Sequence, residues 1–379
     1  MRDHFLRAIS SLILSLALAA TACAADAPSE AKLTPEIYHR TVFLGDSITD
    51  GNTYPQLVRD AFAQAKLPKM IAINAGIGGD TAAGMLARLD RDVLVHQPTL
   101  VTFSAGANDA LHGVTPEAYE RDVRAIVRRM KKEKVTLILL TPNVLGPKQQ
   151  AKGRANLDAY ETILRKIAKE DGLRIAEVNR RQKQDAAAGR GQLAPDDLHP
   201  NWNGQTMIAR AVLDAMGYDN VAVPDHISNE PVPGVIPQWR IKRLGPKDAP
   251  LSEAVVATIK PDDSWQKLAL PETTPIPDFD ANNRWLDDYR TLGASVSLRQ
   301  QPGGGKYLGV AIIKSDKAKA VTFTTGGELQ QIWLNGKQIY QNDWKHGYHI
   351  GRESVKAELK PGENQVVIAT GAVFFVSVE

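Results

Sequence analysis

Cysteine is almost absent from this chain of 379 residues, because Cys23 is the only one. It lies close to the N-terminus, so the rest of the chain can form no disulfide and offers no thiol nucleophile. The folded protein must therefore be stabilised by packing.

The chain also lacks a large excess of either charge. It has 46 lysine and arginine residues against 43 aspartate and glutamate residues, and the formal net charge is +3. The densest basic stretch, residues 128–134, falls at the end of an expected helix, where cations interact favourably with the dipole. No basic run is long enough to follow a phosphate backbone, so we expect no nucleic-acid partner. The composition is typical of a soluble globular protein, and the length predicts two domains.

A long hydrophobic run is likewise missing. The most apolar stretch, residues 9–20, is shorter than the roughly 20 residues that a membrane-spanning helix needs, so we expect no membrane span. Arg2 and Arg7 precede this stretch and small residues follow it, which is the pattern of an export signal. We therefore expect residues 1–25 to be a signal peptide and the protein to be periplasmic or secreted.

The end of this signal has two interpretations. The tripeptide Ala-Cys-Ala at residues 22–24 fits an A-x-A cleavage site. Alternatively, Cys23 is the lipidated first residue of a lipoprotein, which usually requires a larger aliphatic residue than Ala20 three positions earlier. The sequence favours cleavage and leaves the lipoprotein as the minor alternative.

From residue 41 to about residue 218, apolar runs alternate with helical patterns. The runs are apolar at nearly every position, as in strands that are covered on both faces. Repeated strand–helix units predict a three-layer α/β/α domain with a parallel sheet over residues 38–220. The expected strands cover residues 41–46, 70–76, 99–106, 135–142 and 174–179, and the expected helices cover residues 54–65, 81–96, 116–133, 154–171 and 203–216.

The pattern changes after residue 220. Residues 221–250 are rich in proline and have little periodicity, which indicates a linker. Short strand patterns separated by turns then predict an all-β sandwich or jelly-roll domain over residues 251–379. Asn335-Gly336, between two apolar runs, is a strong hairpin signal. The strands are expected at residues 295–301, 307–314, 320–325, 329–341, 354–360, 365–370 and 373–378.

Ser47 follows the first apolar run directly, in the stretch VFLGDSITDG at residues 42–51. One interpretation is a strand-to-helix turn in which Asp46 or Ser47 caps the next helix. The other is a nucleophile held at the carboxyl end of a parallel sheet. These ten residues alone favour the cap.

Three further stretches are expected at the same edge of the sheet. Gly79 lies in a glycine-rich stretch after the second strand, where backbone N–H groups can approach a ligand, and Asn108 offers an amide after the third. Asp196 precedes His199 by three residues, a spacing that lets a carboxylate reach the ring N–H. Each stretch alone is more often a turn or a surface loop. Together they predict an acyl-transfer site.

These stretches resemble the sequence blocks of the SGNH (GDSL) hydrolases, over about residues 38–217. The matching motifs are Gly-Asp-Ser at 45–47, Gly79, Gly-x-Asn-Asp at 106–109 and Asp-x-x-His at 196–199. The resemblance implies an SGNH/flavodoxin-like fold in which Ser47 is the nucleophile, His199 the general base and Asp196 its orienting partner. It also implies an oxyanion hole formed by the N–H groups of Ser47 and Gly79 and the side-chain amide of Asn108.

A G-x-S-x-G elbow is missing around Ser47, which disfavours an ordinary α/β-hydrolase. The chemistry of this site requires no cofactor and no metal ion. His346 and His349 are three residues apart, but they have no acidic or thiol companion nearby, and we expect no metal site there.

Five of the six tryptophans lie beyond residue 238. Burial in a sandwich core is the expected role of any one of them, although we expect about two to be exposed. The segments 332–340 and 359–370 resemble the jelly-roll sugar-binding modules attached to glycosidases and carbohydrate esterases. That resemblance implies a carbohydrate ester as substrate, such as an O-acetylated polysaccharide.

The expected function is therefore an exported serine esterase that removes acyl groups, O-acetyl groups above all, from a small-molecule or polysaccharide substrate. A lipolytic or thioester hydrolase on the same fold is an alternative, but the loops at residues 111–119 and 146–154 are too polar to favour an acyl groove. A non-catalytic carbohydrate-binding protein is a third possibility. It predicts a missing triad member, whereas Ser47, Asp196 and His199 are all present.

Overall fold

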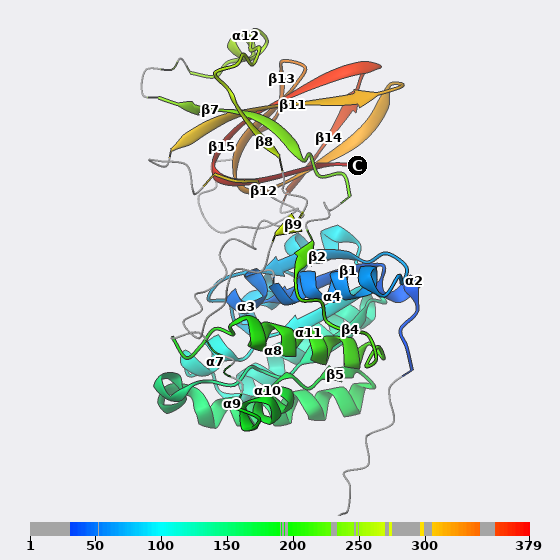
Figure 1. Ribbon diagram of the computed structural model, residues 1–379, viewed down its shortest axis with the longest axis vertical. Helices are drawn as coiled ribbons and strands as arrows, with labels where there is room; N and C mark the ends of the chain where they lie inside the picture. The colour runs from blue at the N-terminus through cyan, green and yellow to red at the C-terminus, as the bar shows by residue number, and fades with distance from the viewer. Residues whose placement is uncertain are drawn as a thin grey trace, which may run out of the picture.

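The computed structural model describes most of the chain beyond residue 30, and these residues form an α/β domain followed by an antiparallel β domain (Figure 1). The expected signal peptide lies outside the described residues, as do Trp285, Trp344, His346 and His349. The described residues are 31–51, 53–189, 191, 193, 196–228, 233–245, 248, 250–269, 273–274, 296–298, 305–341 and 353–379.

The α/β domain is built on a parallel sheet with the strand order β2-β1-β3-β4-β5. Successive residues of β1 point to opposite faces, so Val42 and Leu44 join one core cluster and Phe43 joins the other. Both faces are thus buried, which confirms the three-layer architecture. The strands are β1 (Arg40–Gly45), β2 (Ile71–Gly76), β3 (Leu100–Ser104), β4 (Thr136–Leu140) and β5 (Arg174–Ala176).

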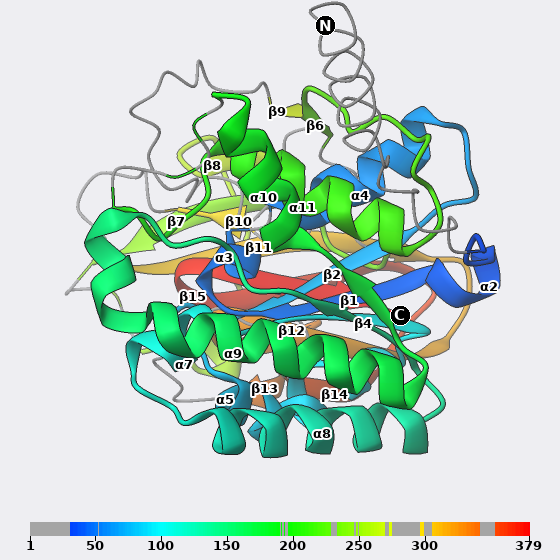
Figure 2. The same ribbon diagram turned by 90° about the horizontal axis from the view of Figure 1, so that it is seen from below.

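Helices cover the two faces of this sheet in two sets. Side chains of α4 and α11 pack into one core cluster and side chains of α5, α8 and α9 into the other. Figure 2 shows α8 and α9 lying side by side along one face. The bounds are α4 (Thr53–Gln64), α5 (Ala82–Ala87), α8 (Pro116–Lys132), α9 (Pro147–Asp171) and α11 (Trp202–Ala215).

Three helical segments differ from the sequence expectation. The single helix expected at residues 81–96 is divided into α5, α6 (Leu89–Asp92) and a 3-10 turn, because Arg88 leaves the helical conformation at φ −110°. Helix α9 begins at Pro147 rather than residue 154, since proline is well suited to the first helical position. Helix α10 (Val178–Ala187) was not expected, because its sequence is mostly polar.

The β domain is an antiparallel sandwich around one main sheet of order β13-β12-β15-β11-β7-β8. Strand β14 pairs with β12, and β10 pairs with β15. Two apolar clusters lie against these strands. The strands are β7 (Gln238–Leu244), β8 (Gln266–Ala269), β10 (Val296–Ser297), β11 (Lys306–Ser315), β12 (Lys319–Leu334), β13 (Lys337–Gln341), β14 (Glu353–Leu359) and β15 (Gly362–Val378).

Two expected turns in this domain are absent. The runs at 320–325 and 329–334 form one strand, β12, and the last two expected strands form one strand, β15. Gly327, at φ +70°, instead lies where the register of β12 against β15 shifts. The glycines thus mark irregularities within long strands rather than chain reversals. The hairpin at Asn335-Gly336 is confirmed, with φ values of +52° and +85° joining β12 to β13.

The expected linker at residues 221–250 is shorter than predicted. Its first part packs on the α/β domain, where Val221 and Ile227 join the core. Strand β7 lies inside the expected linker and pairs with β8 and β11. Its alternation of buried and exposed positions was hidden in a proline-rich and charged context.

The described tryptophans of the β domain are buried, with exposed fractions of 3% for Trp239, 7% for Trp265 and 0% for Trp333. These three side chains present no face for stacking on a sugar. The expectation of about two exposed tryptophans can therefore hold only for Trp285 and Trp344, outside the described residues. Within the described part of the chain, no helix is long and apolar enough to cross a membrane.

Candidate active site

Ser47 is the first residue of the short helix α3 (Ser47–Asp50), which begins immediately beyond the carboxyl end of β1. Asp46 caps this helix, because its Oδ1 accepts a hydrogen bond from the N–H of Ile48 at 2.9 Å. A Cβ on Gly45 would lie 1.9 Å from the Oγ1 of Thr49, so only glycine lets the chain turn so tightly here. The cap by Asp46 and the position of Ser47 at the carboxyl end of the sheet thus occur together, although the sequence presented them as alternatives.

His199 reaches Ser47 from a loop 152 residues further along the chain, with His199 Nε2 at 2.9 Å from Ser47 Oγ. The other ring nitrogen, Nδ1, lies 2.6 Å from Asp196 Oδ2. The three side chains therefore form a continuous hydrogen-bonded series from carboxylate through imidazole to hydroxyl. Such a series can pass the hydroxyl proton to the ring while the carboxylate fixes its orientation.

Asp196 is held by more than the imidazole. Its Oδ1 accepts hydrogen bonds from the backbone N–H groups of Leu198 and His199, both at 3.0 Å. Partial burial opposes ionisation, but the hydrogen bonds from the His199 ring and from these two N–H groups prevail and lower the pKa of Asp196. Asp196 is therefore a carboxylate acceptor at neutral pH.

Hydrogen-bond donors surround Ser47 on the side of β2 and β3. Gly79 is in the left-handed region at φ +81°, and a Cβ on the neighbouring Gly78 would lie 3.9 Å from Ser47 Cβ, so this glycine-rich loop lies beside the serine. Among the described residues, the N–H groups of Ser47 and Gly79 donate to no other group of the protein. Both N–H groups are therefore available to donate hydrogen bonds to a bound oxyanion.

The third expected donor, Asn108, is 9% exposed and lies at the start of α7 (Ala107–Leu111). Its Nδ2 donates to the backbone oxygen of Asp80 at 3.0 Å and faces Asp46 Oδ2 at 3.4 Å. The second distance is longer than a normal N–H···O hydrogen bond, so this contact is weak. One amide hydrogen of Asn108 is consequently only loosely held.

Two buried carboxyl groups lie beneath these donors. Burial, followed by the charges of Asp109 and Asp80, raises the pKa of Asp46 to about 7. Burial raises the pKa of Asp109 to about 6, and its Oδ1 accepts the N–H of Ala82 at 3.0 Å. Perturbed carboxyl groups of this kind concentrate at functional sites.

Arg88 is a residue of this region that the sequence analysis missed. Its guanidinium is 6% exposed, donates to Asp80 Oδ2 at 2.7 Å and also binds Asp92. Its other hydrogen bonds go to the backbone oxygens of Ala75 at 2.7 Å and Gly45 at 3.0 Å, so it ties together the ends of β1 and β2. A detectable signal was the Arg–Asp pair at i, i+4 spacing in a helical pattern.

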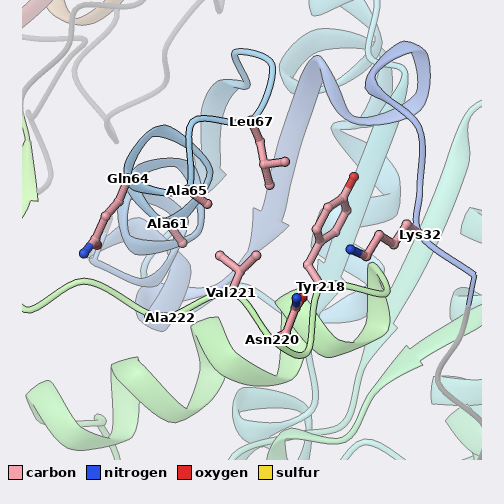
Figure 3. A pocket seen from close by; sticks show the side chains of 9 residues that line it. All are labelled: Lys32, Ala61, Gln64, Ala65, Leu67, Tyr218, Asn220, Val221 and Ala222. Carbon is pink, nitrogen blue, oxygen red and sulfur yellow. The ribbon is translucent and has the colours of Figure 1, made fainter.

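Other parts of the described structure show no competing centre of chemistry. No group of three or more metal-ligating side chains occurs among the described residues. A hollow of about 380 Å³ between α4 and the segment after α11 is lined by Lys32, Leu67 and Tyr218 among others (Figure 3). A second, of about 740 Å³, lies on β7, β8 and β11. None of the expected site residues lines either hollow.

Residues 43–207 match the model of the GDSL-like Lipase/Acylhydrolase family. The acetylxylan esterase of Geobacillus stearothermophilus is 28% identical over 211 residues, covering 48% of this chain and 94% of that protein. Thioesterase 1/protease 1/lysophospholipase L1 of Escherichia coli (strain K12) is 29% identical over 174 residues, covering 44% of this chain and 78% of that protein. Among solved structures, LAE5, an alpha/beta hydrolase enzyme from the metagenome of Lake Arreo, Spain, is 29% identical, covers 48% of this chain and 96% of its own, and has a TM-score of 0.44.

Proposed function

Because residues 43–207 match the GDSL-like Lipase/Acylhydrolase family model, we propose that this domain is a serine esterase with Ser47, His199 and Asp196 as its catalytic triad. The observation that carries the proposal is the pair of contacts at 2.9 Å between Ser47 and His199 and at 2.6 Å between His199 and Asp196. These contacts join Ser47 to a pair of residues about 150 positions further along the chain, and their order supports acyl transfer.

In the proposed mechanism, His199 Nε2 takes the proton of Ser47 as Oγ attacks the ester carbonyl. The resulting imidazolium is stabilised by the carboxylate of Asp196 and then gives its proton to the departing alcohol. Water attacks the acyl-enzyme in the second half of the cycle, with His199 again acting as the base. The acid is released and the Ser47 hydroxyl is restored.

The negative charge that develops on the carbonyl oxygen would be met by the N–H groups of Ser47 and Gly79 and by the side-chain amide of Asn108. Each such donor is worth about 2.7–4 kcal/mol of transition-state stabilisation. The weakly held hydrogen on Asn108 supports this role, because the oxyanion can take it from Asp46 at little cost. The buried carboxyl groups below, and Arg88 behind them, would keep the donors in position.

The substrate we propose is an acylated carbohydrate, with O-acetyl groups the first candidates. The support is the similarity to an acetylxylan esterase and the polar loops near the site. The expected signal peptide supports an exported enzyme, to which such polysaccharides are accessible. A thioesterase or lysophospholipase activity is the second candidate, because another relative carries those names.

Three substrates separate these candidates. Purified protein should release acetate from acetylated xylan and hydrolyse p-nitrophenyl acetate, with little turnover of p-nitrophenyl palmitate. Faster hydrolysis of the palmitate or of palmitoyl-CoA would favour the lipolytic alternative. Absence of hydrolysis on all of them, together with retained binding to xylan, would leave a carbohydrate-binding protein.

A further inference from the structure

Asp197 lies inside the loop that carries Asp196 and His199, yet it has no step in the proposed mechanism. Its backbone is in the left-handed region at φ +60°, which a residue other than glycine adopts rarely. A residue with a side chain in this backbone conformation calls for an explanation.

The side chain of Asp197 caps a helix from a distant part of the chain. Helix α9 starts after Gly146, which has no side chain with which to cap it. Asp197 Oδ2 instead accepts a hydrogen bond from the N–H of Lys148, the second residue of α9, at 3.0 Å. This is the bond that an N-cap side chain normally makes, and the negative charge also suits the helix N-terminus.

Backbone contacts join the same two segments. The N–H of Gly146 donates to the backbone oxygen of Asp197 at 2.8 Å. The side chain of Gln149 donates to the backbone oxygen of Asp196 at 3.1 Å. Three hydrogen bonds therefore dock the Asp196–His199 loop onto the first turn of α9.

Close packing adds to these bonds. Gly146 has an ordinary φ of −75°, so its own backbone conformation does not require glycine. A Cβ there, however, would lie 2.5 Å from the Cβ of Asp197. The two segments of the chain approach so closely at Gly146 and Asp197 that one of these two positions must lack a side chain.

The far end of the loop has its own anchor. Asn201 caps α11 by accepting the N–H of Gly204 at 3.1 Å, and its Nδ2 donates to the backbone oxygen of Gly191 at 3.1 Å. The segment with Asp196 and His199 thus runs between an anchor on α11 and an anchor on α9. Asp197 is the side chain that provides the second.

We propose that Asp197 is a positioning residue, which holds Asp196 and His199 in register with Ser47 by binding the loop to the N-terminus of α9. This proposal rests on the proposed function, because it assigns Asp197 a role in that same site. The consequence is that removing the cap should lower kcat, since the triad geometry is disturbed while the substrate-binding surface is not.

The first test compares variants at position 197 in the hydrolysis of p-nitrophenyl acetate. Asp197→Gly keeps the left-handed backbone and loses the cap, so kcat should fall about 10- to 100-fold with KM within about twofold. Asp197→Asn keeps an acceptor oxygen and tolerates the same φ, so it should retain most of kcat. Thr115→Ala, which removes the side-chain cap of α8, is the matched control and should lower the melting temperature without lowering kcat.

The second test uses the close approach of Gly146 to Asp197. Gly146→Ala should lower kcat as Asp197→Gly does, because the new methyl group displaces the loop. In the double variant the methyl group has room, so the loss should not exceed that of Asp197→Gly alone. Additive losses would mean that the two positions act separately, and the proposal would be wrong.

The third test asks whether Asp197 acts through the triad. In a His199→Ala background, Asp197→Gly should cost little further activity, because the base that the loop positions is gone. An undiminished loss there would indicate a general structural effect and overturn the assignment. Wild-type kcat in Asp197→Gly would overturn it as well.

A spectroscopic readout separates this proposal from the esterase proposal. The proton between His199 Nδ1 and Asp196 should give a downfield NMR signal that Asp196→Ala abolishes, Asp197→Gly weakens and Asp197→Asn preserves. An unchanged signal in Asp197→Gly contradicts the positioning role. Full ester hydrolysis by Ser47→Ala contradicts the esterase proposal, whatever the signal shows.

Discussion

The two domains differ in what they bury. The α/β domain buries charged side chains, and among the least exposed are Asp46 and Asp109, which lie beyond the carboxyl ends of β1 and β3. In the described part of the β domain, the buried polar residues are all neutral: Thr325, Asn364, Thr370 and Ser377. Buried charge is costly, and carboxyl groups with raised pKa values concentrate at functional sites, so Asp46 and Asp109 support the site proposed around Ser47.

The largest effect should come from Ser47→Ala. Loss of the nucleophile is expected to lower kcat by about 10⁴-fold or more. The melting temperature should hardly change, because the hydroxyl lies at the solvent-facing edge of the sheet. Ser377→Ala, a buried serine in the β domain, is the control and should leave ester hydrolysis intact. Comparable activity losses in both variants would remove the functional difference between the domains.

The orienting carboxylate should matter less than the base. We expect His199→Ala to lower kcat about as much as Ser47→Ala, and Asp196→Asn to lower it about 10- to 100-fold less. The reason is that the imidazole can still take the proton when its orientation is less well fixed. Steady-state kinetics of both variants on p-nitrophenyl acetate check the order. Equal or reversed losses would show that Asp196 is not the orienting group.

Arg88→Met tests the cost of unpairing buried charge. The substitution leaves Asp80 without its arginine, leaves Asp92 with Arg91 alone, and removes two hydrogen bonds to strand ends, so the free energy of unfolding should fall by about 3–5 kcal/mol. Arg240→Met, on a partly exposed arginine of β7, should cost less than about 1 kcal/mol. Urea denaturation measures both. Similar costs would mean that the buried charges of the α/β domain carry no special weight.

The smallest effect is a dependence of stability on pH. Burial raises the pKa of Asp46 to about 7 and that of Asp109 to about 6, whereas in the unfolded chain both titrate near about 4. Between about pH 4 and pH 7 the folded state therefore retains protons that the unfolded state has released, and stability falls as pH rises.

The change between pH 5 and pH 8 should be on the order of 1–3 kcal/mol. Asp46→Asn should reduce it, while Asp316→Asn, at an exposed carboxylate of the β domain, should not. Denaturation curves at the two pH values provide the measurement. Asp196, whose pKa is lowered, acts only at more acidic pH and does not interfere. A stability that rises with pH in this range would contradict the assignment.

The elements that sequence reasoning located well are those whose pattern is local. The first four parallel strands are continuous apolar runs, and Ser47, Gly79 and Asn108 follow the ends of the first three. Asp196 and His199 follow α10 rather than the end of a strand, and the signal for them was the Asp-x-x-His spacing.

What was missed depends on distant contacts. Arg88 breaks its helix in order to bind strand ends that lie 13 and 43 residues away in the chain. Helix α10 is mostly polar, so it has no apolar periodicity. Asp197 binds Lys148, which lies 49 residues away in the chain, and such a contact leaves no local pattern. A turn was expected between residues 325 and 329, because a glycine in an irregular strand and a glycine in a turn look alike in the local sequence.

The length of β12 and β15 has a consequence for how the β domain unfolds. Each strand contributes side chains from both of its halves to one apolar cluster, and the two strands are paired along most of their length. A local opening at either end would therefore have to shear the common ladder. Amide hydrogen exchange along both strands should accordingly report a single, global opening rather than separate fraying of the two ends.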